Sequence, residues 1–328
     1  MTEKPSFQDL LEPEISRWGQ ELLSRWQQRH LTIPRLLYHY TTAEGLVGIL
    51  NTQSFWMTNI RYMNDFSELQ YATTLALDVI ATKRKQYVGK PMLVEFFHRT
   101  ENSVSPFRKG NEVFAVSFCE EGNLLSQWRA YGDRGGGYAI GIDFFHLLRF
   151  LPRRCALRKV IYDPEDQQNI LGQAIDSLCG FVEKMTEGLD IKEATTRNIL
   201  PKCCSVLPRI FGEYLVCFKH PEFAEEKEWR LIATMDCDFV LNRNEDANLL
   251  KFRTFRGNIV PYVEVTLTNA TAASRDDQCG LGFFVSEMVI GPTLNPDMNT
   301  DSLRMLLGQI NPDLCPQIRQ SGIPLRWL

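Results

Sequence analysis

Several kinds of site lack their usual signals in this chain of 328 residues. The nine cysteines contain no C-x-x-C pair, and none of the five histidines stands at metal-ligand spacing from another. Structural zinc sites are built from such pairs, and disulfide frameworks need regularly spaced cysteines. The sequence therefore predicts reduced, mostly buried thiols and no metal site.

Long apolar runs and an excess of basic residues are also missing. No stretch approaches the roughly 20 apolar residues that cross a bilayer, and the opening MTEKPSFQDLLEPE lacks the charged-then-apolar profile of a signal peptide. The net charge of -4 and the pI of about 5.8 argue against a general electrostatic grip on nucleic acid, although a local basic patch stays open. We expect a cytoplasmic protein without a membrane partner.

The chain has enough apolar content for a large core. With 44% hydrophobic and 11% aromatic residues, it suits one large domain or two moderate ones. Because the apolar strand patterns return without regular alternation with helices, we predict an α+β fold with a mixed or antiparallel central sheet and flanking helices. The predicted strands are residues 36–40, 55–60, 112–119, 228–234, 261–267, 284–290 and 323–327. A further buried strand is predicted at the end of residues 124–143, after a short helix and a glycine-rich turn.

Long helical periodicity occupies two further regions. In residues 13–30, Trp18 and Trp26 recur at helical spacing, which predicts a helix that packs on the domain or forms a homo-oligomer contact. Residues 162–219 carry the same periodicity and predict a helical insertion or cap laid against the sheet. We therefore divide the chain into an N-terminal helical extension, 1–35, and a single α+β domain, 36–328, with an insertion at about 163–218.

Residues 36–68 are the stretch around which the rest is arranged. They predict a strand, a helix from Thr41 or Thr42, a second strand, and a helix entered through Asn64-Asp65. Thr41 with Glu44 has the spacing of a capping box, and Asp65 with Glu68 repeats that spacing. Polar and aromatic side chains gathered at strand ends usually line a cleft. The polar and aromatic residues at the strand ends of this stretch are His39, Tyr40, Asn59, Arg61, Tyr62, Asn64 and Asp65.

A second candidate region is FAEEKEWRL, residues 223–231. On a strand, Glu226, Glu228 and Arg230 share one face and Trp229 points to the other. The charged face lies either in solvent as an ordinary Glu–Arg pair or in a cleft. In a cleft, two carboxylates beside an arginine supply a general base or an anion that stabilises a cationic transition state.

Between these regions, Trp128, Arg129 and Tyr131 precede a glycine-rich turn. They form either a stacked structural cluster or one wall of a ligand site. The amides of Gly135-Gly136-Gly137 could face a phosphate. Because these glycines precede a strand instead of opening a helix, a flexible turn is favoured.

Five motifs in order carry a resemblance to a known family. HYTTAEGLVGIL, MTNIRYMNDFSE, SQWRAYG with the following glycines and GID, FAEEKEWRL and VIGP together resemble a bacterial family catalogued as domain of unknown function 2971. The resemblance covers residues 36–292. The family name implies no activity.

The opening motif also carries a more distant resemblance. H-Y-T followed by G-L-x-x-I-L is similar to the first strand and helix of the ADP-ribosyltransferase superfamily, in its branch with a histidine, an aromatic and a glutamate. The resemblance implies an ADP-ribosyltransferase-like fold and an NAD-consuming transferase or glycohydrolase, such as a toxin, an effector or an anti-phage defence enzyme. Carried over, the histidine that holds the ribose is His39, with Thr41 beside it, and the glutamate is Glu228, with Glu226 two positions earlier. The nicotinamide-stacking tyrosine is Tyr62 or Tyr71.

This resemblance implies a specific chemistry and a specific geometry. Cleavage of the bond between nicotinamide and ribose develops positive charge on the sugar, which a fixed carboxylate such as Glu228 favours. We expect Asn64 to contact NAD, and Arg61, Arg129 or Arg230 to hold its pyrophosphate. No metal is required. The acceptor stays open between protein, nucleic acid, a small molecule and water. The hypothesis requires His39 and Glu228 to face each other across one cavity.

Two other functions stay open at this point. One is a non-catalytic module of the same fold that binds a nucleotide or a protein partner. The other is a nuclease that holds magnesium through Asp65, Glu68 and the Glu226/Glu228 pair. It is the least favoured, because no carboxylate spacing indicates a preformed metal cage.

Overall fold

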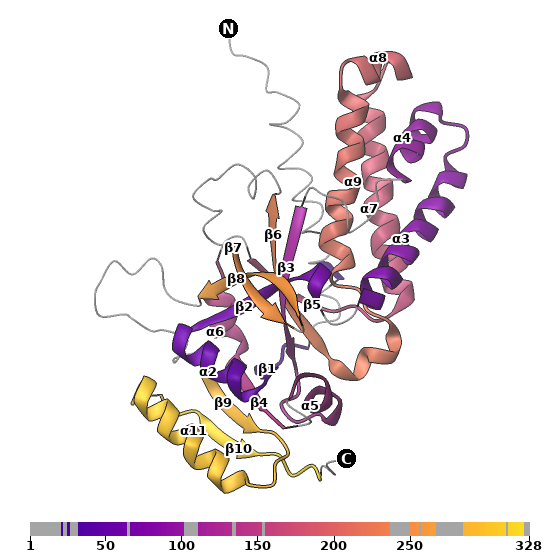
Figure 1. Cartoon of the computed structure of the whole chain (residues 1–328). Coiled ribbons are helices and arrows are strands. Elements are labelled where there is room, and N and C mark those ends of the chain that lie inside the picture. The colour runs from indigo at the N-terminus through magenta and orange to yellow at the C-terminus, as the bar shows by residue number, and fades with distance from the viewer. Residues whose placement is uncertain are drawn as a thin grey trace.

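The computed structural model describes residues 21, 25–26, 32–63, 66–101, 111–132, 136–152, 155–236, 250–255, 257–266, 285–312 and 314–324. Ten strands in these residues form one sheet (Figure 1). They are β1 (Leu36–Thr41), β2 (Ser54–Asn59), β3 (Asn111–Cys119), β4 (Tyr138–Asp143), β5 (Cys155–Lys159), β6 (Glu228–Asp236), β7 (Leu250–Phe255), β8 (Asn258–Thr266), β9 (Val285–Ile290) and β10 (Gln317–Gln320).

The sheet is open and mostly antiparallel. Its order is β10-β9-β4-β1-β3-β2-β8-β7, and β6 pairs with β3 and with β5. The β9–β10 pair is parallel and the other pairs are antiparallel. The predicted α+β architecture, with a mixed or antiparallel central sheet and flanking helices, is therefore confirmed in this mostly antiparallel form.

Helices cover both faces of the sheet (Figure 1). The longer ones are α2 (Ala43–Thr52), α3 (Phe66–Gln86), α4 (Pro91–Glu101), α7 (Pro164–Met185), α9 (Ile199–Leu215) and α11 (Pro296–Ile310). The shorter ones are α5 (Leu125–Tyr131), α6 (Phe144–Arg149), α8 (Ile191–Thr196) and the 3-10 turns η1 (Ile60–Tyr62) and η3 (Pro221–Glu226). None of the described helices is both long and apolar enough to span a membrane.

One face of the sheet carries a helical bundle. Helices α3, α4, α7, α8 and α9 pack together and extend away from the sheet (Figure 1). Their shared core includes Phe96, Leu178 and Phe211, and it reaches β3 through Val113 and Ala115. The helices predicted at 163–218 are therefore present, but they pack largely on α3 and α4 instead of lying flat on the sheet.

The opposite face packs against α2, α6 and α11. This second core contains Phe55, Phe114, Phe118 and Trp229, together with apolar residues of the three helices. Side chains alternate along β3, so that Phe114, Val116 and Phe118 face this core while Val113 and Ala115 face the bundle. Trp229 points away from Glu228 and Arg230, as predicted, and it is buried in this core.

The sheet opens along one edge of β3. The other edge of this strand pairs with β6 along its whole length. On the open edge, β1 pairs at Cys119 through Tyr38, while β2 pairs at Ala115 and Phe114 through Thr58 and Asn59. Between these positions no described strand pairs with β3 on that edge. The gap between β1 and β2 is the feature that positions the candidate site.

Several element boundaries differ from the prediction. Thr42, not Thr41, caps α2, because Thr41 still pairs with Tyr138 in the β1–β4 ladder and the helix begins only after it. Helix α4 and strands β5, β7 and β10 were not predicted. Strand β10 (QIRQ) is polar and mostly exposed, so it lacks an apolar alternation, and residues 323–324 of the predicted last strand are not strand. The capping residue Asp65 and nearly all of the 13–30 helix lie outside the described residues.

The cysteines follow the predicted pattern where they are described. Seven are free thiols, and five of these are buried. Burial raises the pKa of the Cys119 and Cys179 thiols to about 12, so these side chains are inert apolar packing groups at neutral pH.

Candidate functional site

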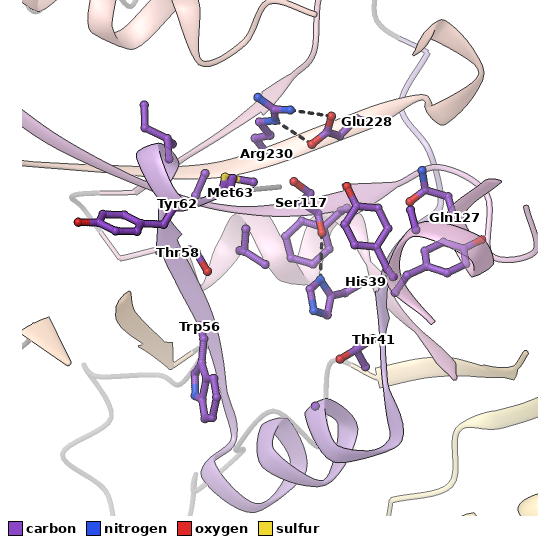
Figure 2. A pocket seen from close by; sticks show the side chains of 18 of the residues that line it. His39, Thr41, Trp56, Thr58, Tyr62, Met63, Ser117, Gln127, Glu228 and Arg230 are labelled. Carbon is purple, nitrogen blue, oxygen red and sulfur yellow. Dashed lines mark hydrogen bonds and ion pairs between the residues drawn. The ribbon is translucent and has the colours of Figure 1, made fainter. Parts of the chain in front are cut away.

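A cavity of about 830 Å³ lies where β1 and β2 part along β3 (Figure 2). Its walls come from β1, α2, β2, β3, α5, β6 and β7, which span more than two hundred residues of sequence. The volume falls within the roughly 300–1,000 Å³ typical of ligand pockets. The predicted site residues that line it include His39, Thr41, Tyr62, Glu226, Glu228 and Arg230.

The His39 side chain forms a hydrogen bond with the backbone of β3 at its open edge. Its Nδ1 lies 3.0 Å from the carbonyl oxygen of Ser117, in the gap between β1 and β2. Because a carbonyl only accepts hydrogen bonds, Nδ1 carries the hydrogen, and Nε2 of the neutral ring is left as an acceptor. The ring packs edge-on against Phe55 and Phe118, at centroid distances of 5.2 and 5.8 Å. Burial lowers the pKa of His39, which keeps the ring neutral.

Thr41 follows His39 at the end of β1, beside the first turn of α2. The Thr42 side chain accepts a hydrogen bond from the Gly45 amide at 3.1 Å, and Thr41 lines the cavity. A Cβ at position 45 would lie 2.0 Å from the Thr41 Oγ1, so only glycine lets the threonine sit against the helix. Figure 2 shows Thr41 and His39 on the same side of β3.

The opposite wall of this part of the cavity comes from β2 and from the neighbouring hairpin. Trp56 and Thr58 of β2 line it, together with Arg253 of β7, a residue that no sequence motif indicated. The Arg253 Nη2 donates to the Thr58 Oγ1 at 2.8 Å. We call His39, Thr41, Trp56, Thr58 and Arg253 the histidine side of the cavity.

The predicted acidic residues belong to a buried network that we call the charge cluster: Glu68, Lys219, Glu226, Glu228 and Arg230. The Arg230 Nε and Nη2 donate to the two oxygens of Glu228 at 2.7 and 2.9 Å, and Nη2 also contacts Glu68 at 2.7 Å. The Lys219 Nζ lies 2.7 Å from Glu68, 2.5 Å from Glu226 and 3.3 Å from Glu228. Glu228 and Arg230 are only 4% and 6% exposed, which excludes the solvated Glu–Arg pair.

The charge cluster shifts the pKa values of Glu226 and Glu228 in opposite directions. Burial by itself would raise the pKa of Glu228, but the charges of Arg230 and Lys219 outweigh it and lower that pKa to about 2. At Glu226, burial raises the pKa and Lys219 offsets only part of the effect. Of its two oxygens, Oε2 contacts Lys219, whereas Oε1 has no cation partner among the described residues. Glu228 is thus a fixed anion, and Glu226 is better suited to exchange a proton.

His39 and Glu228 reach the cavity from opposite faces of the sheet. Tyr38 and Glu228 both pair with Cys119, so their side chains share one face, and His39, next to Tyr38, points to the other. Figure 2 shows Glu228 and Arg230 on one side of β3 and His39 on the other. The strand register offsets these two residues by one position. Their side chains therefore do not face each other directly, as the hypothesis of cleavage by His39 and Glu228 had required.

The remaining predicted residues are dispersed. The Tyr71 hydroxyl donates to Gln167 at 2.8 Å and its ring contacts His220 edge-on, so it does not line the cavity, whereas Tyr62 does. Arg129 is exposed and is not part of the cavity wall. Arg61 is paired with Glu112 at 3.3 Å. Asn64 lies outside the described residues.

Helix α5 contributes to both structure and site. Trp128 is fully buried, packs edge-on against Tyr40 at 4.6 Å and donates from its indole to Asn123 at 2.9 Å. Tyr131 and the buried Gln127 instead line the cavity. Burial raises the pKa of Tyr131, and nearby Glu228 raises it further, which places this ring beside the charge cluster. Trp128 therefore belongs to a structural cluster, whereas Gln127 and Tyr131 line the cavity.

The glycines after α5 serve close backbone packing where they are described. The Gly291 amide donates to the Gly137 carbonyl at 2.8 Å, and a Cβ at Gly132 would lie 1.8 Å from the Gly136 oxygen. Gly135 lies outside the described residues. In the part of the chain that the structure describes, no group of three His, Cys, Asp or Glu side chains is placed to hold a metal ion.

Comparison with known families matches one stretch of the chain. Residues 127–231 match the model described as "Protein of unknown function (DUF2971)". This range runs from α5 to β6 and supports the predicted family resemblance there; the motifs of residues 39–68 and VIGP lie outside it. No curated protein and no solved structure matches the chain.

Proposed function

We propose that the cavity binds NAD or a related nucleotide. The observation that carries this proposal is that aromatic rings and polar groups without a partner among the described residues, from separate elements, line one cavity of about 830 Å³. His39 offers Nε2 as an acceptor, Thr41 offers a hydroxyl, and Trp56 and Tyr62 offer ring faces. Clefts with a few convergent polar groups among apolar ones are the usual form of a small-molecule site.

Each of these groups suits one part of a nucleotide. An aromatic face stacks on a base or on nicotinamide. The neutral His39 ring accepts a hydrogen bond from a ribose hydroxyl, which is also the role that the ADP-ribosyltransferase resemblance gives to this histidine. Because His39 is fixed by Ser117 and by two phenylalanine rings, it is pre-oriented for that contact.

Calorimetry with purified protein tests this proposal. NAD, ADP-ribose and nicotinamide mononucleotide are titrated into the wild type and into Trp56→Leu, His39→Phe and Tyr71→Phe variants. We expect binding that Trp56→Leu and His39→Phe weaken by about tenfold or more, since each removes a stacking face or a hydrogen bond to the ligand. Tyr71→Phe is the matched control away from the cavity. Failure of all three ligands to bind the wild type would refute the proposal.

NAD cleavage, by a transferase or a glycohydrolase in toxin, effector or defence roles, is a second candidate. One observation favours it: Glu226 lines the cavity with a raised pKa and with no cation on its Oε1 among the described residues, beside the ring of Tyr131. A carboxylate there can stabilise the developing ribosyl cation or take a proton from the acceptor. Glu228 is less suited, because Arg230 and Lys219 neutralise its charge. Because His39 and Glu226 reach the cavity from different sides of β3, cleavage would require the bond between nicotinamide and ribose to lie in the gap between β1 and β2.

Nicotinamide release separates the two candidates. If the protein cleaves NAD, Glu226→Gln should slow release by roughly 10²–10⁴-fold. Glu225→Gln is the matched control, because Glu225 lies on the same 3-10 turn and is exposed. Unchanged release in Glu226→Gln would exclude this carboxylate. Binding of NAD without any nicotinamide release would leave the binding proposal standing alone.

A further inference from the structure

Arg253 is a partly buried cation on the histidine side with unused donors. Its Nη2 donates to the Thr58 Oγ1 at 2.8 Å, whereas its Nε is buried and has no hydrogen-bond partner among the described residues. The guanidinium carbon lies 5.6 Å from the ring centre of Trp56 and 5.8 Å from that of Tyr262. The side chain thus lies against two neighbouring aromatic rings and a hydroxyl, and its Nε–H has no acceptor among the described residues.

Two other arginines of this sheet have carboxylate partners. Arg230 contacts Glu228 and Glu68, and Arg319 contacts Glu287 at 2.7 Å. Arg253 has no carboxylate within ion-pair distance among the described residues. Burial lowers the pKa of Arg253, but a guanidinium still stays charged at neutral pH. Partly burying a charge without a counter-ion is unfavourable, so an anion that enters the cavity would relieve this cost.

The position of Arg253 places such an anion next to the nucleotide-binding groups. Arg253 lines the same cavity as His39 and Trp56, and its charge is close enough to lower the pKa of His39 further. The planar guanidinium fork matches the oxygens of a phosphate in a bidentate arrangement. The two rings and Thr58 restrict its orientation before a ligand binds, which reduces the entropy lost on binding.

We propose that Arg253 binds a phosphate or diphosphate group of the ligand on the histidine side of the cavity. This proposal rests on the proposed nucleotide-binding function and adds the anionic part of the ligand to it. Arg253 thereby takes the role that the sequence had suggested for Arg61, Arg129 or Arg230. In the described structure these are respectively ion-paired with Glu112, exposed on α5, and held in the charge cluster.

Calorimetry with ligands that differ only in phosphate content tests it. ADP, inorganic pyrophosphate and adenosine are titrated into the wild type, Arg253→Met, Arg253→Lys and Lys251→Met. Lys251 is the matched control: it lies on the same face of β7, is exposed, and pairs with Glu264 outside the cavity wall. Loss of a charge-assisted contact in Arg253→Met should weaken ADP about 10- to 100-fold and leave adenosine unchanged.

The remaining variants and the salt dependence test the proposal even if Arg253→Met does not fold. Arg253→Lys keeps the charge but not the fork, so it should restore part of the ADP affinity, and Lys251→Met should bind as the wild type does. Without any variant, ADP binding by the wild type should weaken as salt rises, whereas adenosine binding should not. Equal affinities of wild type and Arg253→Met for ADP, or equal salt dependence for ADP and adenosine, would overturn the proposal.

The outcome also separates this proposal from the binding function on which it rests. NAD binding that is unchanged in Arg253→Met would remove the role of Arg253 and leave the nucleotide site intact. Binding of ADP and pyrophosphate through Arg253, with no contribution from His39 or Trp56 and no affinity for NAD, would keep the anion site and remove the NAD assignment.

Discussion

The charge cluster and the histidine side line one cavity, but they differ in whether their charged groups have partners of opposite charge. In the cluster, Lys219 and Arg230 contact three carboxylates, and the whole network is nearly withdrawn from solvent. On the histidine side, within the described part of the chain, Arg253 has no carboxylate partner and the His39 Nε2 has no hydrogen-bond partner. A network whose members satisfy one another stabilises the fold, whereas unsatisfied groups in a cavity are available to a ligand. The acidic motif therefore marks mainly a structural network, and the groups available to a ligand lie on the histidine side of the cavity.

The largest expected effect comes from breaking the charge cluster. Arg230→Met leaves Glu228 and Glu68 buried with only Lys219 as a counter-charge, so the free energy of unfolding should fall by about 3–5 kcal/mol. Urea denaturation measures this change. Arg129→Met, at an exposed position on α5, should change it by less than about 0.5 kcal/mol. Equal effects of the two substitutions would show that the cluster does not stabilise the fold.

The pH dependence of stability should report the same cluster. The folded-state pKa of Glu228, about 2, lies below its ordinary value of 4.5, so its contribution is fully present above pH 4.5 and is lost as the pH falls towards 2. That loss amounts to about 3 kcal/mol. The stability difference between wild type and Glu228→Gln should therefore shrink over this range in urea titrations. The free energy of unfolding of the exposed control Glu225→Gln should follow that of the wild type at every pH. A stability difference between Glu228→Gln and the wild type that does not change with pH would contradict the lowered pKa.

His39→Phe should have an intermediate effect on stability. The ring can still pack on Phe55 and Phe118, but the Ser117 carbonyl loses its donor, which should cost about 1–2 kcal/mol. Because burial lowers the pKa of His39, its stabilising contribution is present above pH 6.5 and declines as the pH falls below that value. Thermal unfolding of wild type and variant should thus converge in acid. Divergence instead would mean that the folded protein favours the protonated ring.

The smallest stability effect is expected at Tyr62. This side chain is 46% exposed, so Tyr62→Ala should change the free energy of unfolding by less than about 0.5 kcal/mol. If its ring stacks on the ligand, however, the variant should lose roughly 1–3 kcal/mol of nucleotide binding in calorimetry. Tyr71→Phe should show the reverse, with lost stability from its Gln167 hydrogen bond and unchanged binding. Unchanged binding by Tyr62→Ala would remove this ring from the site.

Much of the fold was predictable because its signals are local. The apolar and β-branched runs of β1, β3 and β6 have the period of strands, and α7 and α9 carry long helical periodicity. Strand β7 was missed because LKFRTF alternates weakly and exposes four of its six residues. Arg253 was missed with it, since a lone arginine outside any motif gives no sequence signal for burial or for a missing partner.

The sequence by itself determined the secondary structure of the core, the residue types available at β1 and β6, and the burial of Trp229 behind its charged neighbours. Only the tertiary structure decided which of those residues meet. One residue of register at Cys119 places His39 and Glu228 on opposite faces, and the pairing of β7 with β8 brings Arg253 beside Trp56. The physical reason is that side-chain periodicity is a property of each strand alone, whereas register, face and ion pairing depend on contacts between segments far apart in the chain.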